Sequence, residues 1–420
     1  MVDLRAWLRG LFGPRAEEAP YPGPAGAPAE LEPPGTFAEG HNAFALALYG
    51  RLCRRPGNLF ISPFSIRTAL AMTYAGAGGE TAEQMGRALR FNSPGEALHA
   101  AFAEVIRRLN AAGGGEYEMA VANALWAQEG APPLSDFLER VAAHYGGGLN
   151  VVDFRRDAEG ARALINLWVE ERTRQRIAGL LPQGGLGGDT RLVLVNAVYF
   201  KGLWRLPFRE SATRPEPFYL EDGGEVRAPL MRQREAVRYM AAADFQAAEL
   251  DYRGGDLSML LLLPNRKDGL RDLEKGLSAR MLRECVAQMS VREVELLLPR
   301  FKVTWGTEEI GSHLRALGMT LAFERSRADF SGINGLEPSH AESLFISAIF
   351  HKTFVEVNEQ GTEAAAATAV VMDVRSAMPN HNPPPVPVFR ADHPFLFAIR
   401  ELKSDTLLFL GRVADPTRES

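Results

Sequence analysis

The segment Leu192–Phe200, which reads LVLVNAVYF, limits most strongly how this chain can fold. It is apolar at every position except Asn196, and it is rich in β-branched and aromatic residues. Such a run predicts a strand that is covered on both faces. The chain has 420 residues, of which 46% are hydrophobic, so it is long and apolar enough to bury a large core around such a strand.

The order of the other expected elements decides the fold class. Apolar spacing predicts helices early in the chain and mostly strands later, without alternation of single strands and helices, and this order favours an α+β fold over a doubly wound sheet. Thr81 is expected to cap its helix. The expected helices are Phe37–Arg54, Ser65–Ala75, Thr81–Leu89, Ala97–Leu109 and Ala158–Ile177, and the other expected strands are Asn58–Phe64, Tyr117–Trp126, Leu257–Leu263, Val294–Val303, Leu344–Val357, Phe395–Ile399 and Thr406–Arg412.

Composition excludes several classes of function. The net charge of −5 gives no electrostatic reason to expect nucleic-acid binding. No run of about 18 apolar residues is present, so no membrane span is expected. Cys53 and Cys285 lie far apart in no motif, and the eight histidines have no ligand spacing. We therefore expect two free thiols, no metal and no cofactor.

The N-terminal part, residues 1–36, is expected to be a disordered extension rich in Pro and Ala, ahead of a single domain over residues 37–417. Its first dozen residues have apolar side chains at helical spacing, interrupted by Arg5 and Arg9. That stretch is too short and too charged for a signal-peptide core. It reads as a frayed helix, with a weak amphipathic membrane anchor as the alternative.

One segment, Glu363–Pro387, is out of character because it is small and polar, then Pro-rich, and lies between two convincing strands. Loops of this length inside a compact domain are usually functional or disordered. If the segment from Thr362 became a strand, one face would be wholly uncharged and both acidic residues, Glu363 and Asp373, would fall on the other. That pattern suits insertion into an existing sheet; a flexible linker or an Ala-rich helix is the alternative. The uncharged face holds Thr362, Ala364, Ala366, Thr368, Val370 and Met372.

Several motifs in a fixed order then resemble one family. The run from Phe354 to Thr368, FVEVNEQGTEAAAAT, looks like the hinge signature of inhibitory serpins, and the resemblance extends from about Phe37 to Pro416. The amino-acid composition is rich in Arg, Ala and Gly, which we attribute to the base composition of the source genome. We expect that genome to be bacterial. The other family-like segments are NLFISPFSI from Asn58, VNAVYFKGLW from Val195, LPRF from Leu298, FSGI from Phe330 and DHPFLF from Asp392.

The resemblance implies a serpin fold, with three β-sheets, about nine helices and an exposed reactive-centre loop over about residues 359–388. In this family the scissile residue normally lies fourteen residues after the hinge glycine; counting from Gly361 gives Arg375, followed by Ser376. Arg375 is also the only Lys or Arg between Lys352 and Arg390, which suits a trypsin-like protease. A shifted count would place Val374 or Met372 there instead, for an elastase- or chymotrypsin-like protease. The implied hinge comprises Glu359, Gly361, Thr362, Ala364, Ala365, Ala366 and Ala367.

The implied function is suicide inhibition of a serine protease, in which the target supplies the catalytic groups and the cleaved loop inserts into the main sheet. The chain is thus expected not to be an enzyme. No GxSxG elbow surrounds Ser62 or Ser65, which argues against a hydrolase. Glu359 is expected to form an exposed salt bridge with Arg300, worth about 0–1 kcal/mol. The residues expected to control sheet opening are Ser62, Ser65, Asn196, His351 and Trp204.

Other interpretations stay open at this point. A non-inhibitory carrier or chaperone of the same family is one, although the small hinge residues argue against it, and an inhibitor of a cysteine-type protease is another. The protein is expected to be a monomer. The family resemblance favours an extracellular location, and a cytoplasmic one is the alternative because no secretion signal is recognisable.

Overall fold

The computed structural model describes residues 34–92, 95–112, 117–130, 132–362 and 385–419. Most of the helices come early in this part of the chain and most of the strands come late, as the sequence predicts for an α+β fold. The α-helices are α2 (Pro34–Leu52), α3 (Pro63–Tyr74), α4 (Gly79–Ala88), α5 (Glu96–Ala112), α6 (Ser135–Tyr145), α7 (Ala158–Arg172), α8 (Leu270–Gly276), α9 (Ala279–Gln288), α10 (Gly311–Arg315) and α11 (Ser331–Asn334).

The strands form two hydrogen-bonded sheets. The six-stranded sheet has the order β10-β11-β12-β4-β2-β3, and the nine-stranded sheet runs β1-β15-β14-β8-β7-β6-β9-β13, with β5 paired to β6. The strands are β1 (Leu59–Ile61), β2 (Tyr117–Gln128), β3 (Leu149–Val152), β4 (Leu192–Leu203), β5 (Arg214–Tyr219), β6 (Glu225–Ala241), β7 (Phe245–Asp251), β8 (Leu257–Pro264), β9 (Ser290–Pro299), β10 (Phe301–Glu309), β11 (Ile346–Asn358), β12 (Gly361–Thr362), β13 (Val388–Arg390), β14 (Phe395–Glu401) and β15 (Thr406–Val413).

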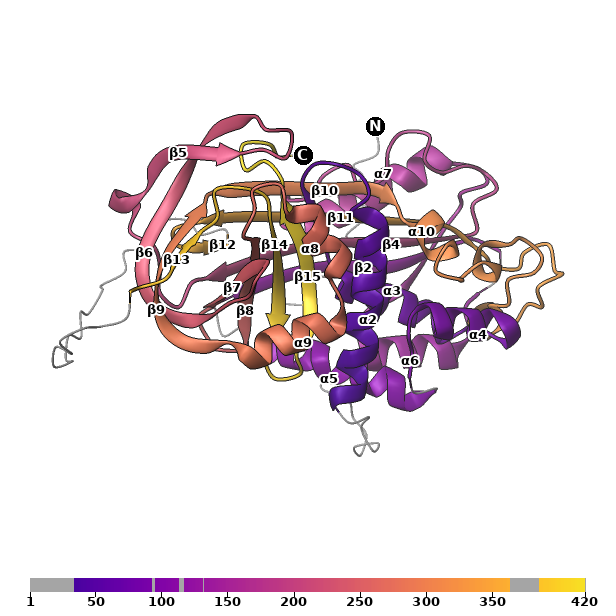
Figure 1. Ribbon diagram of the computed structural model, residues 1–420. Coiled ribbons are helices and arrows are strands. Elements are labelled where there is room, and N and C mark those ends of the chain that lie inside the picture. Colours follow the sequence, from indigo (N-terminus) through magenta and orange to yellow (C-terminus); the bar gives the residue numbers. More distant parts are fainter. Residues whose placement is uncertain (1–33, 93–94, 113–116, 131, 363–384, 420) are drawn as a thin grey trace.

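The nine-stranded sheet consists of two parts that share β6. The first half of β6 pairs with β5, its centre and second half with β9, and only its last residues, from Arg238, with β7. Counted on either side of β6, the smaller part holds β5, β9 and β13 and the larger part holds β7, β8, β14, β15 and β1. With the six-stranded sheet these parts make the three-sheet arrangement expected from the sequence. Figure 1 shows β5 and β6 at one end of the molecule and α4 and α6 at the other.

Strand β4 is covered on both faces, as its apolar run predicts. Its side chains alternate between two separate cores: Leu194 and Val198 belong to the larger one, whereas Val193 and Val195 belong to the smaller one. The smaller core also holds Trp168 and other residues of α7, so α7 covers one face of the six-stranded sheet. The larger core lies on the opposite face, between the two sheets.

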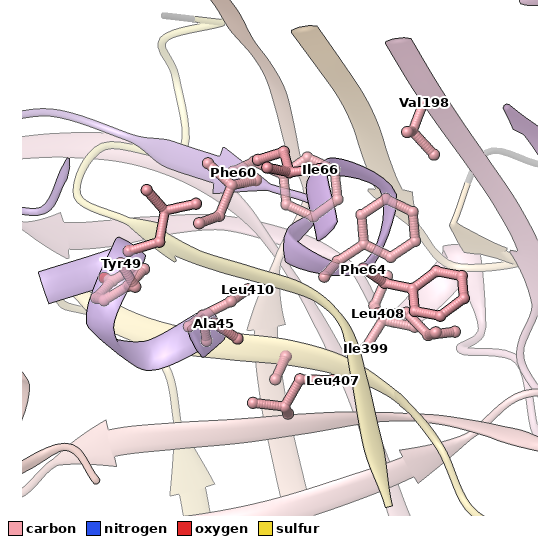
Figure 2. Packing of buried hydrophobic residues seen from close by; sticks show 14 of the residues in the cluster. Ala45, Tyr49, Phe60, Phe64, Ile66, Val198, Ile399, Leu407, Leu408 and Leu410 are labelled. Atoms are coloured by element: carbon pink, nitrogen blue, oxygen red, sulfur yellow. The ribbon is translucent and has the colours of Figure 1, made fainter. Parts of the chain in front are cut away.

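Figure 2 shows this larger core where α2 and α3 meet β15. Ala45 and Tyr49 of α2 and Phe64 of α3 are buried beside leucines of β15. Val198 of β4 faces the same cluster from the six-stranded sheet. The N-terminal helices thus fix the nine-stranded sheet directly behind β4.

A buried guanidinium joins α3 to the end of α4. Arg67 is 1% exposed, and its carbon Cζ lies 4.9 Å from the centroid of the Phe91 ring and within 5.5 Å of two further phenylalanine rings. Its Nε and Nη2 atoms donate to the backbone oxygens of Leu89 and Arg90 at 2.9 and 2.8 Å. Aromatic faces and carbonyl groups together replace the water that this charge loses on burial.

The prediction of one continuous strand over Val294–Val303 is wrong, because the structure divides this segment into two strands of different sheets. β9 ends at Pro299 in the nine-stranded sheet and β10 begins at Phe301 in the six-stranded sheet. At Arg300 the backbone nitrogen donates to the Pro229 oxygen at 2.8 Å, so the chain crosses between sheets there. Local apolar periodicity does not reveal this crossing.

Two helix ends also differ from expectation. Thr81 is not an N-cap: α4 begins at Gly79, and the buried Thr81 hydroxyl oxygen accepts from the Asp329 backbone nitrogen at 3.0 Å. The helix expected to reach Ile177 ends at Arg172, because Arg174 and Gln175 adopt left-handed backbone angles, with φ of 51° and 63°.

In the described residues no helix is long and apolar enough to cross a membrane. Cys53 is half-buried, Cys285 is buried, and both are free thiols, as expected.

Candidate functional site

The short strand β12 lies as a wedge between the two central strands of the six-stranded sheet. β4 and β11 pair in parallel from Leu192 and Ile346 to Tyr199 and Phe354. Just beyond that pairing, Thr362 of β12 is opposite Gly202 of β4 and Val357 of β11, antiparallel to both. The sheet is therefore closed along its length and already parted at one end by Gly361 and Thr362, two residues of the hinge expected from the sequence.

Two glycines permit this close approach. A side chain at Gly361 would place its Cβ 2.0 Å from the Gly202 backbone oxygen. A side chain at Gly202 would place its Cβ 2.8 Å from the Tyr252 ring. Any other residue at Gly361 would therefore force β12 away from β4.

The turn before β12 is held by the segment that follows β4. Trp204 donates from its backbone nitrogen to the Gln360 oxygen at 2.9 Å and from Nε1 to the Asn358 oxygen at 3.0 Å. The Phe208 backbone nitrogen donates to the Glu359 oxygen at 2.8 Å. Three successive carbonyl groups at the base of the hinge are thus fixed, and Trp204, which the sequence analysis expects to control sheet opening, lies beside this turn.

Glu359 anchors the same turn through its side chain. The ion pair with Arg300 expected from the sequence is confirmed, with Nε and Nη2 of Arg300 donating to the carboxylate at 2.6–2.8 Å. It is not an exposed pair, because Glu359 is only 3% exposed, and Thr213 donates to it as well. Burial alone would raise the pKa of this carboxyl, but the hydrogen bonds from Arg300 and Thr213 outweigh burial and lower it.

A polar cluster lies beneath the closed part of the sheet. The His351 side chain of β11 reaches Asn196 Oδ1 of β4 through Nδ1, and its Nε2 accepts from the Ser62 backbone nitrogen at 3.2 Å. These partners fit a neutral ring with the proton on Nδ1. Burial lowers the pKa of His351 from 6.5 to about 3, so the ring is neutral at physiological pH.

The cluster extends to a residue that the sequence analysis missed. Asn196 Nδ2 donates to Ser65 Oγ and to Asn123 Oδ1, each at 2.5 Å, and Ser65 Oγ donates to Asn123 Oδ1 at 2.8 Å. Asn123 lies on β2, directly opposite Asn196. The signal available for it was weak: a polar residue in a loosely alternating strand. The cluster thus joins β2, β4, β11 and α3.

The same geometry is unsuited to hydrolysis. Both ring nitrogens of His351 already have partners, and neither serine hydroxyl is one of them. Ser62 Oγ donates instead to the Leu408 backbone oxygen at 2.9 Å. Since a nucleophilic serine needs a base within hydrogen-bond reach, these residues form a structural network. Within the described ranges no group of three His, Cys, Asp or Glu side chains could hold a metal ion.

The remaining expected site residues lie outside the described part of the chain. These are the reactive bond, Arg375 and Ser376, and the hinge alanines Ala364, Ala365, Ala366 and Ala367.

Comparison with known proteins places these features in one family. The model of the family "Serpin (serine protease inhibitor)" matches residues 39–416. The leukocyte elastase inhibitor of Equus caballus is 41% identical over 368 residues, covering 86% of this chain and 93% of the relative. The leukocyte elastase inhibitor of Homo sapiens is 39% identical over 390 residues, covering 90% and 99%. The crystal structure of uncleaved ovalbumin superposes with a TM-score of 0.80 at 31% identity, covering 91% and 100%.

The chain belongs to the serpin family. Its fold is the serpin fold. The family is described as one of serine protease inhibitors, and the relatives compared above are named as inhibitors, not as catalytic enzymes. The function expected from the sequence is therefore correct at this level, and the identity of the target protease is a separate question.

Proposed function

We propose that this serpin traps a serine protease as a suicide substrate, by inserting its cleaved reactive loop between β4 and β11. The observation that carries the proposal is β12, which occupies the first two positions of such an inserted strand. The protease attacks the loop with its own catalytic serine and forms an acyl-enzyme. Released at its far end, the loop then continues β12 along the length of the sheet.

Extending the register of β12 supports this proposal. Thr362 is opposite Gly202 and Val357, so each further residue moves one position back along both strands. By this count Ala365 meets the pair of Tyr199 and Phe354, and Thr368 arrives between Asn196 and His351. Thr368 shares the face of Thr362, which is turned toward the core, so its hydroxyl would meet the polar cluster as the two strands separate. The inserted strand thus brings a hydrogen-bonding group to the level at which separation of the strands breaks the His351–Asn196 hydrogen bond.

The energy available is sufficient. About ten to fifteen new ladder hydrogen bonds, at about 0.5–1.5 kcal/mol each, release on the order of 5–20 kcal/mol. This range matches or exceeds the stability of an ordinary folded protein, about 5–15 kcal/mol. Distortion of the oxyanion hole of the protease would slow deacylation about 100- to 1000-fold, which holds the complex.

Arg375 is the residue that we propose is presented to the target. It lies fourteen residues after Gly361 and is the only Lys or Arg between Lys352 and Arg390. A specificity pocket with a buried carboxylate would bind it, so a trypsin-like protease is the first candidate target.

An elastase-type target is the second candidate. The relatives of this chain named leukocyte elastase inhibitors share 39–41% identity over most of its length. Met372 and Val374, both close to Arg375, are apolar residues that an elastase- or chymotrypsin-like pocket would accept. The location of the protein, extracellular or cytoplasmic, remains a prediction with either target.

One experiment separates the targets. The protein is incubated in parallel with trypsin and with leukocyte elastase, and the products are separated on a denaturing gel and analysed by mass spectrometry. A covalent complex with trypsin and a cut after Arg375 support the first candidate. A complex with elastase and a cut after Met372 or Val374 would replace it with the second. Cleavage by both enzymes without any complex would contradict inhibition and favour a carrier or chaperone.

A further inference from the structure

Tyr252 is a fully buried residue that contacts the hinge and was not singled out by the sequence. It follows β7 and forms an isolated antiparallel bridge with Trp204. Its ring stacks on the Trp204 ring, with centroids 4.7 Å apart and an interplanar angle of 17°, and it meets the Phe200 ring edge-on at 5.2 Å. The ring is therefore held rigidly behind the parted end of the sheet.

The phenol oxygen of Tyr252 points at the first side chain of the hinge. It lies 2.7 Å from Thr362 Oγ1, and both residues are 0% exposed. Within the described ranges no other residue hydrogen-bonds to the Tyr252 phenol. Burial raises the pKa of this phenol, so the group stays neutral, and one of the two hydroxyls donates to the other.

The absence of a side chain at Gly202 makes this contact possible. A Cβ there would lie 2.8 Å from the Tyr252 ring, in the space that the ring now fills. Gly202 is also the residue opposite Thr362 across the β4–β12 pairing. The backbone register and the side-chain contact therefore select the same position for Thr362.

We propose that Tyr252 is a positioning residue that latches Thr362, so that the hinge rests with two residues already inserted and every insertion starts from one register. If the hinge withdrew, the Tyr252 phenol would remain in an apolar enclosure without its partner. This is unfavourable, because a buried polar group must give up water without compensation. The latch therefore favours the inserted start over a fully withdrawn hinge.

The effect of the Tyr252–Thr362 hydrogen bond on inhibition rests on the proposed function. After cleavage, loop insertion competes with deacylation of the protease. A hinge that is already in place begins insertion at once, whereas a withdrawn hinge must first find the gap between β4 and β11. Removing the latch should thus send more molecules along the substrate path.

Hydrogen exchange tests the latch without any protease. In Tyr252→Phe we expect the amides of residues 357–362 to exchange roughly 2- to 10-fold faster, the factor that corresponds to one neutral hydrogen bond. Tyr239→Phe is the matched control, because its phenol donates to Gln246 Oε1 at 2.8 Å and its ring is 4% exposed, but it lies on β6 away from the hinge. Its exchange at residues 357–362 should equal that of the wild type.

A double-mutant cycle makes the test specific. Thr362→Val replaces the hydroxyl by a methyl group of similar size and should accelerate exchange as Tyr252→Phe does. The two changes together should add nothing beyond either one, because they remove the same bond. Unchanged exchange in Tyr252→Phe, or fully additive effects in the double variant, would overturn the latch.

The inhibition assay then distinguishes the two proposals. With a protease that forms complexes, Tyr252→Phe should raise the number of inhibitor molecules consumed per trapped enzyme and leave the rate of loop cleavage unchanged. Equal consumption by wild type and variant would overturn the functional role of the latch. Altered exchange with no covalent complex for any protease would instead overturn the proposed function and leave the latch intact.

Discussion

His351 on β11 and Asn196 on β4 are hydrogen-bonded side chain to side chain at the same level of the parallel strand pair. Both residues are 0% exposed. Parting the two strands must break this bond, so it opposes opening of the sheet in addition to the backbone ladder.

We expect His351→Ala to lower the temperature at which the sheet opens. The change leaves Asn196 Oδ1 and the Ser62 backbone nitrogen without their partner, at about 1–3 kcal/mol for each buried group. The protein should form polymers, or convert to a loop-inserted form, after milder heating than the wild type. Native gel electrophoresis after graded heating measures this. His340→Ala, at an exposed position, is the control and should behave as the wild type.

A second prediction concerns pH. Burial lowers the pKa of His351 and of His41 to about 3, and the Arg67 charge contributes at His41. As pH falls below 6.5 the unfolded chain takes up these protons and the folded chain does not, so the free energy of unfolding decreases from pH 6.5 down toward 3. At pH 5 the loss is about 2 kcal/mol per histidine, from 1.5 pH units at about 1.4 kcal/mol each.

The melting temperature at pH 7.5 and at pH 5 tests this prediction. Carboxyl groups whose pKa is lowered in the fold, such as Glu359, affect stability only below about pH 4.5, so they do not obscure this window. Asp251 and Asp405, whose pKa values burial raises, act in the opposite direction, so an equal melting temperature at both values would mean that the histidine contribution does not exceed theirs.

The ion pair at the base of the hinge gives a third prediction. Glu359→Gln keeps the shape of the side chain but removes the charge that Arg300 and Thr213 contact. Because Arg300 is half-exposed, we expect a modest loss of about 1–3 kcal/mol, measured by denaturant unfolding. Glu356→Gln on the neighbouring strand is the control and should change stability by less than about 0.5 kcal/mol. Equal effects of the two changes would show that the pair is not an anchor.

Thr362 provides the fourth prediction. Its position is fully enclosed, so Thr362→Arg places a charge where no partner is available and hinders entry of the loop. We expect the target protease to cleave this variant without being trapped, which a denaturing gel shows as loss of the covalent complex. Thr362→Ser keeps the hydroxyl and should retain the complex. A full yield of complex from Thr362→Arg would contradict loop insertion.

The buried Arg67 gives a fifth prediction, independent of function. Arg67→Met leaves the Leu89 and Arg90 oxygens without donors and should lower stability by about 2–4 kcal/mol. Arg87→Met removes an exposed pair with Glu83, at 3.6 Å, and should change stability by about 0–0.5 kcal/mol. Thermal unfolding of the two variants compares them directly.

The sequence predicted what depends on local pattern or on a motif. The apolar run of β4 indicated burial on both faces, and the family resemblance indicated Ser62, Asn196 and His351, which the structure brings into one cluster. The apolar pattern of the sequence did not show where the chain passes from one sheet to the other. The change of sheet at Arg300 is made by a backbone contact with Pro229, which is distant in sequence.

The residues missed at the site share one property. Neither Asn123 nor Tyr252 lies in a recognisable motif. Strand pairing places Asn123 opposite Asn196, and ring stacking places Tyr252 beside Trp204. Long-range register, rather than residue type, decides such contacts. The same holds for Thr81, whose hydroxyl meets the Asp329 backbone nitrogen and not its own helix.

Because β12 enters from one end only, the bonds between β4 and β11 must break in a fixed order. Pairs at Phe354, Thr353 and Lys352 separate before the pair at His351 is reached, and the pair at Ile346 separates last. In the proposed insertion, an advancing strand therefore separates three pairs before it reaches the His351–Asn196 hydrogen bond at the fourth. The position of that hydrogen bond therefore sets how many loop residues enter before a side-chain contact between the two strands must break.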